Sequence, residues 1–187
     1  MKRIISSLIL FLGIALVLSS MALLAASYLT RANSVKDMPK TAELLYSLMP
    51  QIHDGFIDDR SDMSMPIAEL DGTDYVGLIE APLYDSLCPV SAGKGFKHQP
   101  AIIKGSVYSQ DVIVGATDYQ MGFARLISMG DELLFTDMTG AKFTYTVDSI
   151  SVSSNFNAEE ISGEDFDLIL FIKSSYKSEY VIIYCKL

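Results

Sequence analysis

The chain has 187 residues, half of them hydrophobic, and a formal net charge of −9 at pH 7. This length leaves room for one globular domain of about 110 to 130 residues beside an N-terminal apolar segment. Basic residues number 14 against 23 acidic ones. Their scattered placement argues against a nucleic-acid partner, because a surface that follows phosphates needs clustered lysine and arginine. No motif in the sequence indicates a metal or another cofactor, and we expect none.

The first thirty residues predict a membrane anchor. After Lys2 and Arg3, residues 4–29 carry no charge, and as a helix they would extend about 39 Å against a hydrocarbon core of about 30 Å. The alternative is a cleavable signal peptide, with the small residues Ala25, Ala26 and Ser27 at the cleavage site. We predict a single-pass anchor over residues 1–32. The basic N-terminus places the following residues outside the cytoplasm.

Residues 33–70 predict a juxtamembrane helix and a linker. From Thr41 to Gln51 apolar residues recur near helical spacing, with Thr41 as a candidate N-cap and Pro50 near the end. The stretch from His53 to Asp71 is rich in aspartate, methionine and proline without a sustained period, which is typical of a linker.

Residues 71–187 predict a domain built mostly of β-strands. Short apolar runs are separated by turn residues, and Gly140 suits a hairpin at residues 137–140. Residues 143–147 alternate large apolar residues with threonine, as a half-buried strand does. Two short helical pieces are expected at 122–129 and 158–162. Seven or eight strands at this spacing favour a closed or nearly closed barrel. The predicted strands are Tyr75–Ile79, Leu87–Val90, Val112–Val114, Glu132–Thr136, Phe143–Val152, Leu168–Ile172 and Tyr180–Cys185.

Several of these segments resemble the sortase family, near classes B and D. Residues 75–82 followed by Leu87-Cys88-Pro89-Val90 resemble the opening strands of a sortase domain. Residues 112–119, 123–126 and 130–137 resemble the block that carries the family's Gly-His pair, a short helix and Gly-Asp before a strand. Residues 167–173 and 181–187 resemble the last two strands. The resemblance implies a sortase-type barrel of seven or eight strands.

Sortases are cysteine transpeptidases that join surface proteins to the cell wall or to pilins of Gram-positive bacteria. The resemblance implies a thiolate nucleophile, a histidine general acid and base, and an arginine that stabilises developing charge. The matching positions here hold Ala116, Lys173 and Tyr180, with Glu179 as the alternative match for the arginine. The resemblance therefore predicts the fold with its catalytic residues replaced, and the enzyme activity is left uncertain.

Other residues offer little replacement chemistry. Attack by the Lys173 amine would leave a stable amide, so we expect a solvated or salt-bridged lysine there, paired with Glu179 or Asp118. Ser174 and Ser175 would need a base, but His53 and His98 fall in the predicted linker and in a loop.

The two cysteines, Cys88 and Cys185, lie far apart in the sequence. One disulfide and two free buried thiols are both open, and we expect packed rather than reactive side chains.

Two functions follow. The first is a catalytically inactive, membrane-anchored accessory module in the anchoring of surface proteins or pili, which binds a sorting-signal peptide, a pilin or a neighbouring sortase. The second is an active transpeptidase or hydrolase with a nucleophile from outside the family motif. The candidate residues for a peptide groove are Ala116, Asp118, Tyr119, Lys173, Ser174 and Tyr180.

Overall fold

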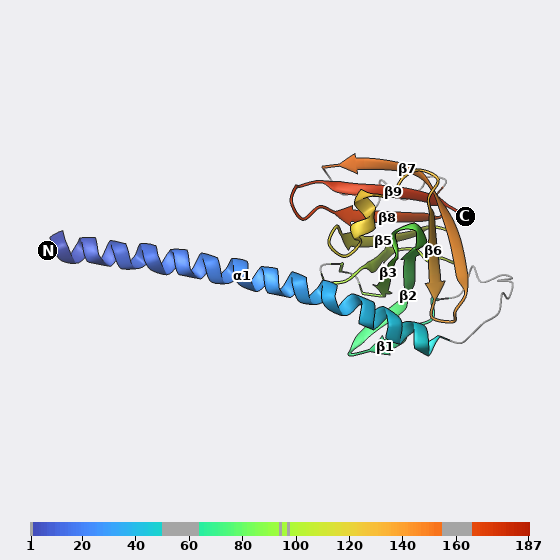
Figure 1. Ribbon diagram of the computed structural model, residues 1–187, viewed down its shortest axis with the longest axis horizontal. Helices are drawn as coiled ribbons and strands as arrows, with labels where there is room; N and C mark the ends of the chain where they lie inside the picture. The colour runs from blue at the N-terminus through green and yellow to red at the C-terminus, as the bar shows by residue number, and fades with distance from the viewer. Residues whose placement is uncertain (1, 50–63, 94, 97, 155–165) are drawn as a thin grey trace.

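The computed structural model describes residues 2–49, 64–93, 95–96, 98–154 and 166–187. A long helix leads into a sheet of nine strands, shown in Figure 1. The elements in chain order are α1 (Lys2–Leu48), β1 (Ala68–Leu70), β2 (Thr73–Ala81), the 3-10 helix η1 (Pro82–Tyr84), β3 (Ser86–Ser91), β4 (Ala101–Lys104), β5 (Val112–Thr117), the 3-10 helix η2 (Gly122–Arg125), β6 (Glu132–Asp137), β7 (Lys142–Ser153), β8 (Leu168–Lys173) and β9 (Tyr180–Lys186).

Eight of the nine strands close into a barrel. Their order in the sheet is β1-β2-β3-β4-β5-β8-β9-β7-β6, and a further pairing of β2 with β6 joins the two ends. β3 runs parallel to β4, and β5 runs parallel to β8. The other pairings are antiparallel. The predicted barrel is therefore confirmed, and closure leaves the eight strands without a free edge.

Alternation of side chains across each strand separates the core from the surface. In β7, Phe143, Tyr145 and Val147 are buried, while Thr144 and Thr146 between them are exposed, as the alternating sequence predicts. Phe135 and Leu170 also have no exposed surface and belong to the same interior cluster.

The hairpin between β6 and β7 forms where the sequence predicts it. Gly140 has a φ of 85°, in the left-handed region that glycine adopts without strain. One carboxylate oxygen of the fully buried Asp137 accepts bonds from the backbone N–H groups of Thr139 and Ala141, at 2.8 and 3.0 Å. The other accepts the Tyr108 hydroxyl at 2.5 Å. The turn is thus fixed from both sides.

α1 differs from the expected helix in length. A helix beginning at Thr41 is wrong, because α1 runs from Lys2 to Leu48 without a break and contains Pro39. A proline inside a helix costs about 3 kcal/mol. Packing offsets this cost at the C-terminal end, where Ala42 and Leu45 are fully buried against Tyr75 and Leu78.

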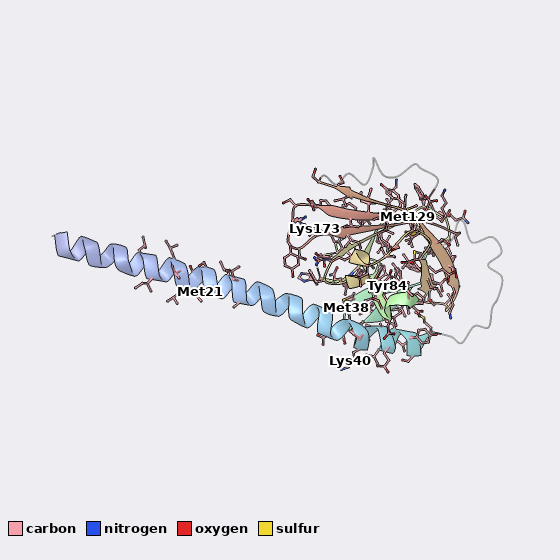
Figure 2. The ribbon with its side chains drawn as sticks, turned by 45° about the horizontal axis from the view of Figure 1, so that its top comes forward. Met21, Met38, Lys40, Tyr84, Met129 and Lys173 are labelled. Atoms are coloured by element: carbon pink, nitrogen blue, oxygen red, sulfur yellow. The ribbon has the colours of Figure 1, made fainter. Side chains whose placement is uncertain are left out.

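The two parts of α1 have different surroundings. Its C-terminal turns lie against the barrel, and its N-terminal half extends away from it (Figure 1). Figure 2 shows Met38 on the side of the helix next to the barrel and Lys40 on the other side. Within the described residues, no helix combines enough length with an apolar enough composition to cross a membrane.

Three other differences concern short elements. β4 was not predicted, because it has only four residues and directly follows Pro100. β1 lies in the predicted linker and adds to β2, so the sheet begins at Ala68 rather than at residue 71. The helix expected at 122–129 is shorter in the structure, where only the 3-10 turn η2 forms. The helix expected at 158–162 lies outside the described residues, as does most of the linker.

Candidate functional site

The ends of β5, β8 and β9 bring the predicted site residues together. β8 lies between the other two strands, and its last residue, Lys173, pairs with Thr117 of β5 and with Tyr180 of β9. Paired residues in neighbouring strands point to the same face of a sheet. Thr117, Lys173 and Tyr180 therefore form one row on the outer face of the barrel, and we call these residues the outer row.

Ala116 does not belong to this row. It pairs with Ile172, which pairs with Val181 of β9, and Ala116 is fully buried in the interior cluster. The side chain of Ala116 cannot line a groove on the outside of the barrel, so its assignment as a groove residue is wrong. The residue beside Lys173 on the outer face is Thr117, one position further along. Its hydroxyl is buried and has no hydrogen-bond partner in the described structure.

Asp118 joins the end of β5 to the loop between β8 and β9. Its carboxylate accepts bonds from the Ser175 hydroxyl at 2.5 Å and the Ser175 backbone N–H at 3.1 Å. It also forms an ion pair with Arg125 of η2, and the guanidinium of Arg125 lies 5.2 Å from the ring centre of Tyr176. Asp118 thus holds the β8–β9 loop against η2.

The electrostatics of this cluster do not favour a serine nucleophile. Burial raises the pKa of Asp118, but the bonds from Ser175 and the charge of Arg125 outweigh burial and lower that pKa overall. A carboxylate with a lowered pKa is a weak base and does not activate the Ser175 hydroxyl. Ser174 has a different role, because its hydroxyl oxygen accepts bonds from the backbone N–H groups of Tyr176 and Lys177.

Lys173 is exposed at the end of β8, and its side chain forms no ion pair in the described part of the chain. Figure 2 shows it at the edge of the barrel. Both carboxylates expected as its partners are used elsewhere: Asp118 pairs with Arg125, and Glu179 pairs with Lys177 at 3.5 Å. Of the two expected states, the solvated lysine is the one observed. Tyr119, another groove candidate, lies half-buried in the turn after β5.

Aromatic side chains cover the outer face next to this row. Tyr180 stacks on Phe171 with ring centres 4.6 Å apart, and Phe96, from the loop between β3 and β4, meets Phe171 edge-on at 6.3 Å. Phe171 is fully buried as a result. A Cβ atom on Gly115 would come within 2.5 Å of the Phe96 ring. The face where a groove is expected is therefore filled by the protein's own side chains.

Neither cysteine is placed for catalysis. Cys88 and Cys185 are both free and buried, so the thiol state is observed rather than the disulfide. Burial raises the pKa of Cys88 to about 11 and that of Cys185 to about 12. At neutral pH both thiols are protonated, and a protonated thiol is a poor nucleophile.

The remaining candidates add no reactive pair. His98 is exposed in the loop before β4 and forms no hydrogen bond within the described structure, while His53 lies outside the described residues. No group of three or more His, Cys, Asp or Glu side chains in the described ranges is close enough to hold a metal ion.

Sequence reasoning missed three residues of this region. Thr117 was missed because the resemblance drew attention to its neighbour Ala116. The signal that could have found it is strand alternation, since Ala116 lies between the outward Gly115 and Thr117. Arg125 and Phe96 come from η2 and a loop, and their approach depends on the fold rather than on any local pattern.

No family model and no curated protein matches the chain, but several solved structures resemble it. Sortase C1 of Streptococcus agalactiae has a TM-score of 0.52 and 15% identity, over 63% of this chain and 69% of that chain. The Clostridium perfringens sortase D5 transpeptidase has a TM-score of 0.53 and 14% identity, over 61% and 79%. Sortase A of Corynebacterium diphtheriae has a TM-score of 0.51 and 12% identity, over 83% of both chains. Together with the closed eight-strand barrel, these similarities show that the chain has the sortase fold.

Proposed function

We propose that this chain is a membrane-anchored sortase-fold protein outside the cytoplasm that binds an extended peptide without cleaving it. The observation that carries the proposal is the composition of the outer row. The outer row holds Thr117, Lys173 and Tyr180, and the positions that the resemblance gives to the imidazole, the thiol and the guanidinium hold Ala116, Lys173 and Tyr180. None of these side chains is a histidine or a cysteine, and the lysine is exposed to solvent rather than buried in an apolar pocket.

The positions of the thiols support the absence of cleavage. Transpeptidation through a thioester needs a thiolate on the face that receives the peptide. Cys88 and Cys185 instead face the interior cluster, where burial raises both pKa values. An alternative nucleophile would need an activating base, and the described hydroxyls of Ser174 and Ser175 contact only backbone N–H groups and the weakly basic Asp118.

Peptide binding is proposed on the outer face between the outer row and the β8–β9 loop. Tyr180, stacked on the buried Phe171, offers an aromatic surface, and the exposed Lys173 offers a cation to a carboxylate. Tyr119 and Ser174 would flank the peptide. Because Phe96 covers part of this surface, the peptide must displace the Phe96 ring. Suitable partners are a sorting signal, a pilin segment or a neighbouring sortase, and the protein would act as an accessory module in anchoring surface proteins or pili.

The membrane anchor is supported by the exposed apolar surface of α1. A helix of a soluble protein usually buries one apolar face, whereas residues 12–24 of α1 carry apolar side chains on all sides of the helix. The exposed large apolar residues of the segment are Leu12, Ile14, Leu16, Val17, Leu18, Met21, Leu23 and Leu24.

Binding and cleavage can be measured separately on the full chain. The purified protein is titrated with a fluorescent sorting-signal peptide, and the mixture is then analysed by mass spectrometry. We expect saturable binding without product, weaker binding after Lys173→Ala and stronger binding after Phe96→Ala. Lys142→Ala, which removes an exposed lysine from β7, is the matched control. Turnover that disappears in Cys88→Ala or Ser174→Ala would overturn the proposal in favour of an active transpeptidase or hydrolase.

The anchor has its own test. In membranes of cells that express the full chain, we expect the protein to resist extraction with alkaline carbonate, and the barrel to be digested by protease added from outside. Release by carbonate, or protection of the barrel in intact cells, would contradict the anchor or its orientation.

A further inference from the structure

A cavity of about 670 Å³ lies between the C-terminal turns of α1 and the turn that joins β2 to β3. This volume is in the range of pockets that bind small ligands or peptide side chains. None of its lining residues belongs to the outer row, so it is a separate feature of the surface. The lining includes Met38, Glu43, Tyr46, Glu80, Asp85 and Gln120.

A buried hydrogen-bond donor in the cavity lining has no partner. Gln120 is only 5% exposed, and its side-chain carbonyl accepts the backbone N–H of Thr117 at 2.8 Å. That bond fixes which end of the amide is which. The amide nitrogen is left without an acceptor in the described structure. A buried donor of this kind is stabilised by a ligand that supplies a carbonyl oxygen.

The charge of the cavity is one-sided. Glu43, Glu80 and Asp85 contribute carboxylates, whereas no lysine or arginine belongs to the lining. In the described part of the chain, none of the three carboxylates takes part in an ion pair. Met38 and Leu87 contribute apolar surface to the same lining. The cavity therefore combines negative charge, apolar surface and one unused donor.

We propose that this cavity binds a basic side chain, lysine or arginine, presented by a peptide segment of a partner protein. The cationic head lies near Glu80 and Asp85, and the alkyl stem packs on Met38 and Leu87. The peptide carbonyl accepts the bond from the Gln120 amide. An anionic ligand is opposed by the three carboxylates. A polyamine carries the charge but has no carbonyl, so a peptide satisfies more of the lining.

The test uses the full chain and three blocked pentapeptides. Each has a central residue between alanines, and that residue is lysine, arginine or norleucine, which has the alkyl stem of lysine without the ammonium group. We expect saturable binding of the first two by fluorescence anisotropy, weakening as salt is added. The norleucine peptide should bind about fivefold more weakly or worse. Equal binding of all three peptides would overturn the proposal. So would binding of spermine to the protein when neither the lysine nor the arginine peptide binds.

Variants locate the binding in the cavity. Glu80→Gln combined with Asp85→Asn should weaken binding roughly two- to fivefold for each charge removed, whereas Glu132→Gln, an exposed carboxylate on β6, should not. Ser47→Trp places a large ring in the cavity from the exposed side of α1 and should abolish binding with little effect on folding. Unchanged affinity in Ser47→Trp would contradict the site. Because Lys173→Ala leaves the cavity intact, it separates this binding from that of the outer face.

Discussion

The inner and outer faces of the β5–β8–β9 sheet differ in which side chains they can accept. On the inner face Ala116, Ile172 and Val181 meet in an aliphatic layer, part of the larger interior cluster. One residue along, the outer row carries a hydroxyl, an ammonium and a phenol. A barrel interior must be filled to be stable, whereas the outer ends of its strands are free to vary. The fold therefore depends on the buried layer more than on the side chains at the outer ends of the strands.

The largest contrast is expected between a core leucine and the exposed lysine of the same strand. Leu170→Ala removes a fully buried side chain and should lower the free energy of unfolding by about 2 to 5 kcal/mol. Lys173→Ala should change it by less than about 0.5 kcal/mol. Thermal unfolding followed by circular dichroism measures both. Similar losses in the two variants would show that the outer row is also part of the stabilising core.

Gly115→Ala tests how tightly the outer face is filled. The new methyl group would lie within 2.5 Å of the Phe96 ring and 2.6 Å of the Ile103 side chain. We expect a loss of about 1 to 3 kcal/mol in the free energy of unfolding. Adding Phe96→Ala should recover part of this loss, and a double-mutant cycle measures the recovery. Strictly additive effects would contradict the contact.

Asp118→Asn tests the connection between η2 and the β8–β9 loop. Loss of the charge weakens the bonds from Ser175 and Arg125 and should cost about 1 to 2 kcal/mol, since Arg125 is partly exposed to solvent. The pKa of Asp118 is lowered in the folded state. Its contribution is therefore complete above about pH 4 and is lost as the pH falls further. The stability difference between the two proteins should shrink over that range, and a constant difference would exclude the linkage.

The smallest expected effect is that of Tyr145→Phe on the interior side. The Tyr145 hydroxyl is buried without a hydrogen-bond partner in the described structure, and burial raises the pKa of this group. Removing it should leave stability unchanged or raise it by up to about 1 kcal/mol. Tyr84→Phe is the control, because the Tyr84 hydroxyl donates to Asp131 at 2.6 Å. The melting temperature of this variant should fall. A clear loss in Tyr145→Phe would indicate a partner for the hydroxyl.

The sequence predicts strands better than it predicts the site. The strands from β5 to β9 could be located because apolar runs alternate with turn residues such as Gly140. β4 escaped because its short run directly follows Pro100 and ends in a lysine. The juxtamembrane helix was given a false beginning at Thr41 because threonine is a common N-cap before apolar residues at helical spacing, whereas in the structure α1 continues back to Lys2.

Within the site, Lys173 and Tyr180 could be predicted as neighbours because they end and begin adjacent strands of a known arrangement. Thr117 could have been placed on the outer face by strand alternation, since a step of one residue from Ala116 reverses the face of a strand. The pairing of Asp118 with Arg125 and the cover provided by Phe96 depend on loops that meet only in the folded chain.

Because α1 is one continuous helix, it fixes the rotational orientation of the barrel about the helix axis. An α-helix turns by about 100° and advances about 1.5 Å with each residue. Because Ala42 and Leu45 clamp the last turns to the barrel, two residues inserted upstream of Met38 would swing the Lys173 end of the barrel through roughly half a revolution relative to the N-terminus. The number of residues in this helix therefore determines which side of the barrel faces a given direction relative to the N-terminus.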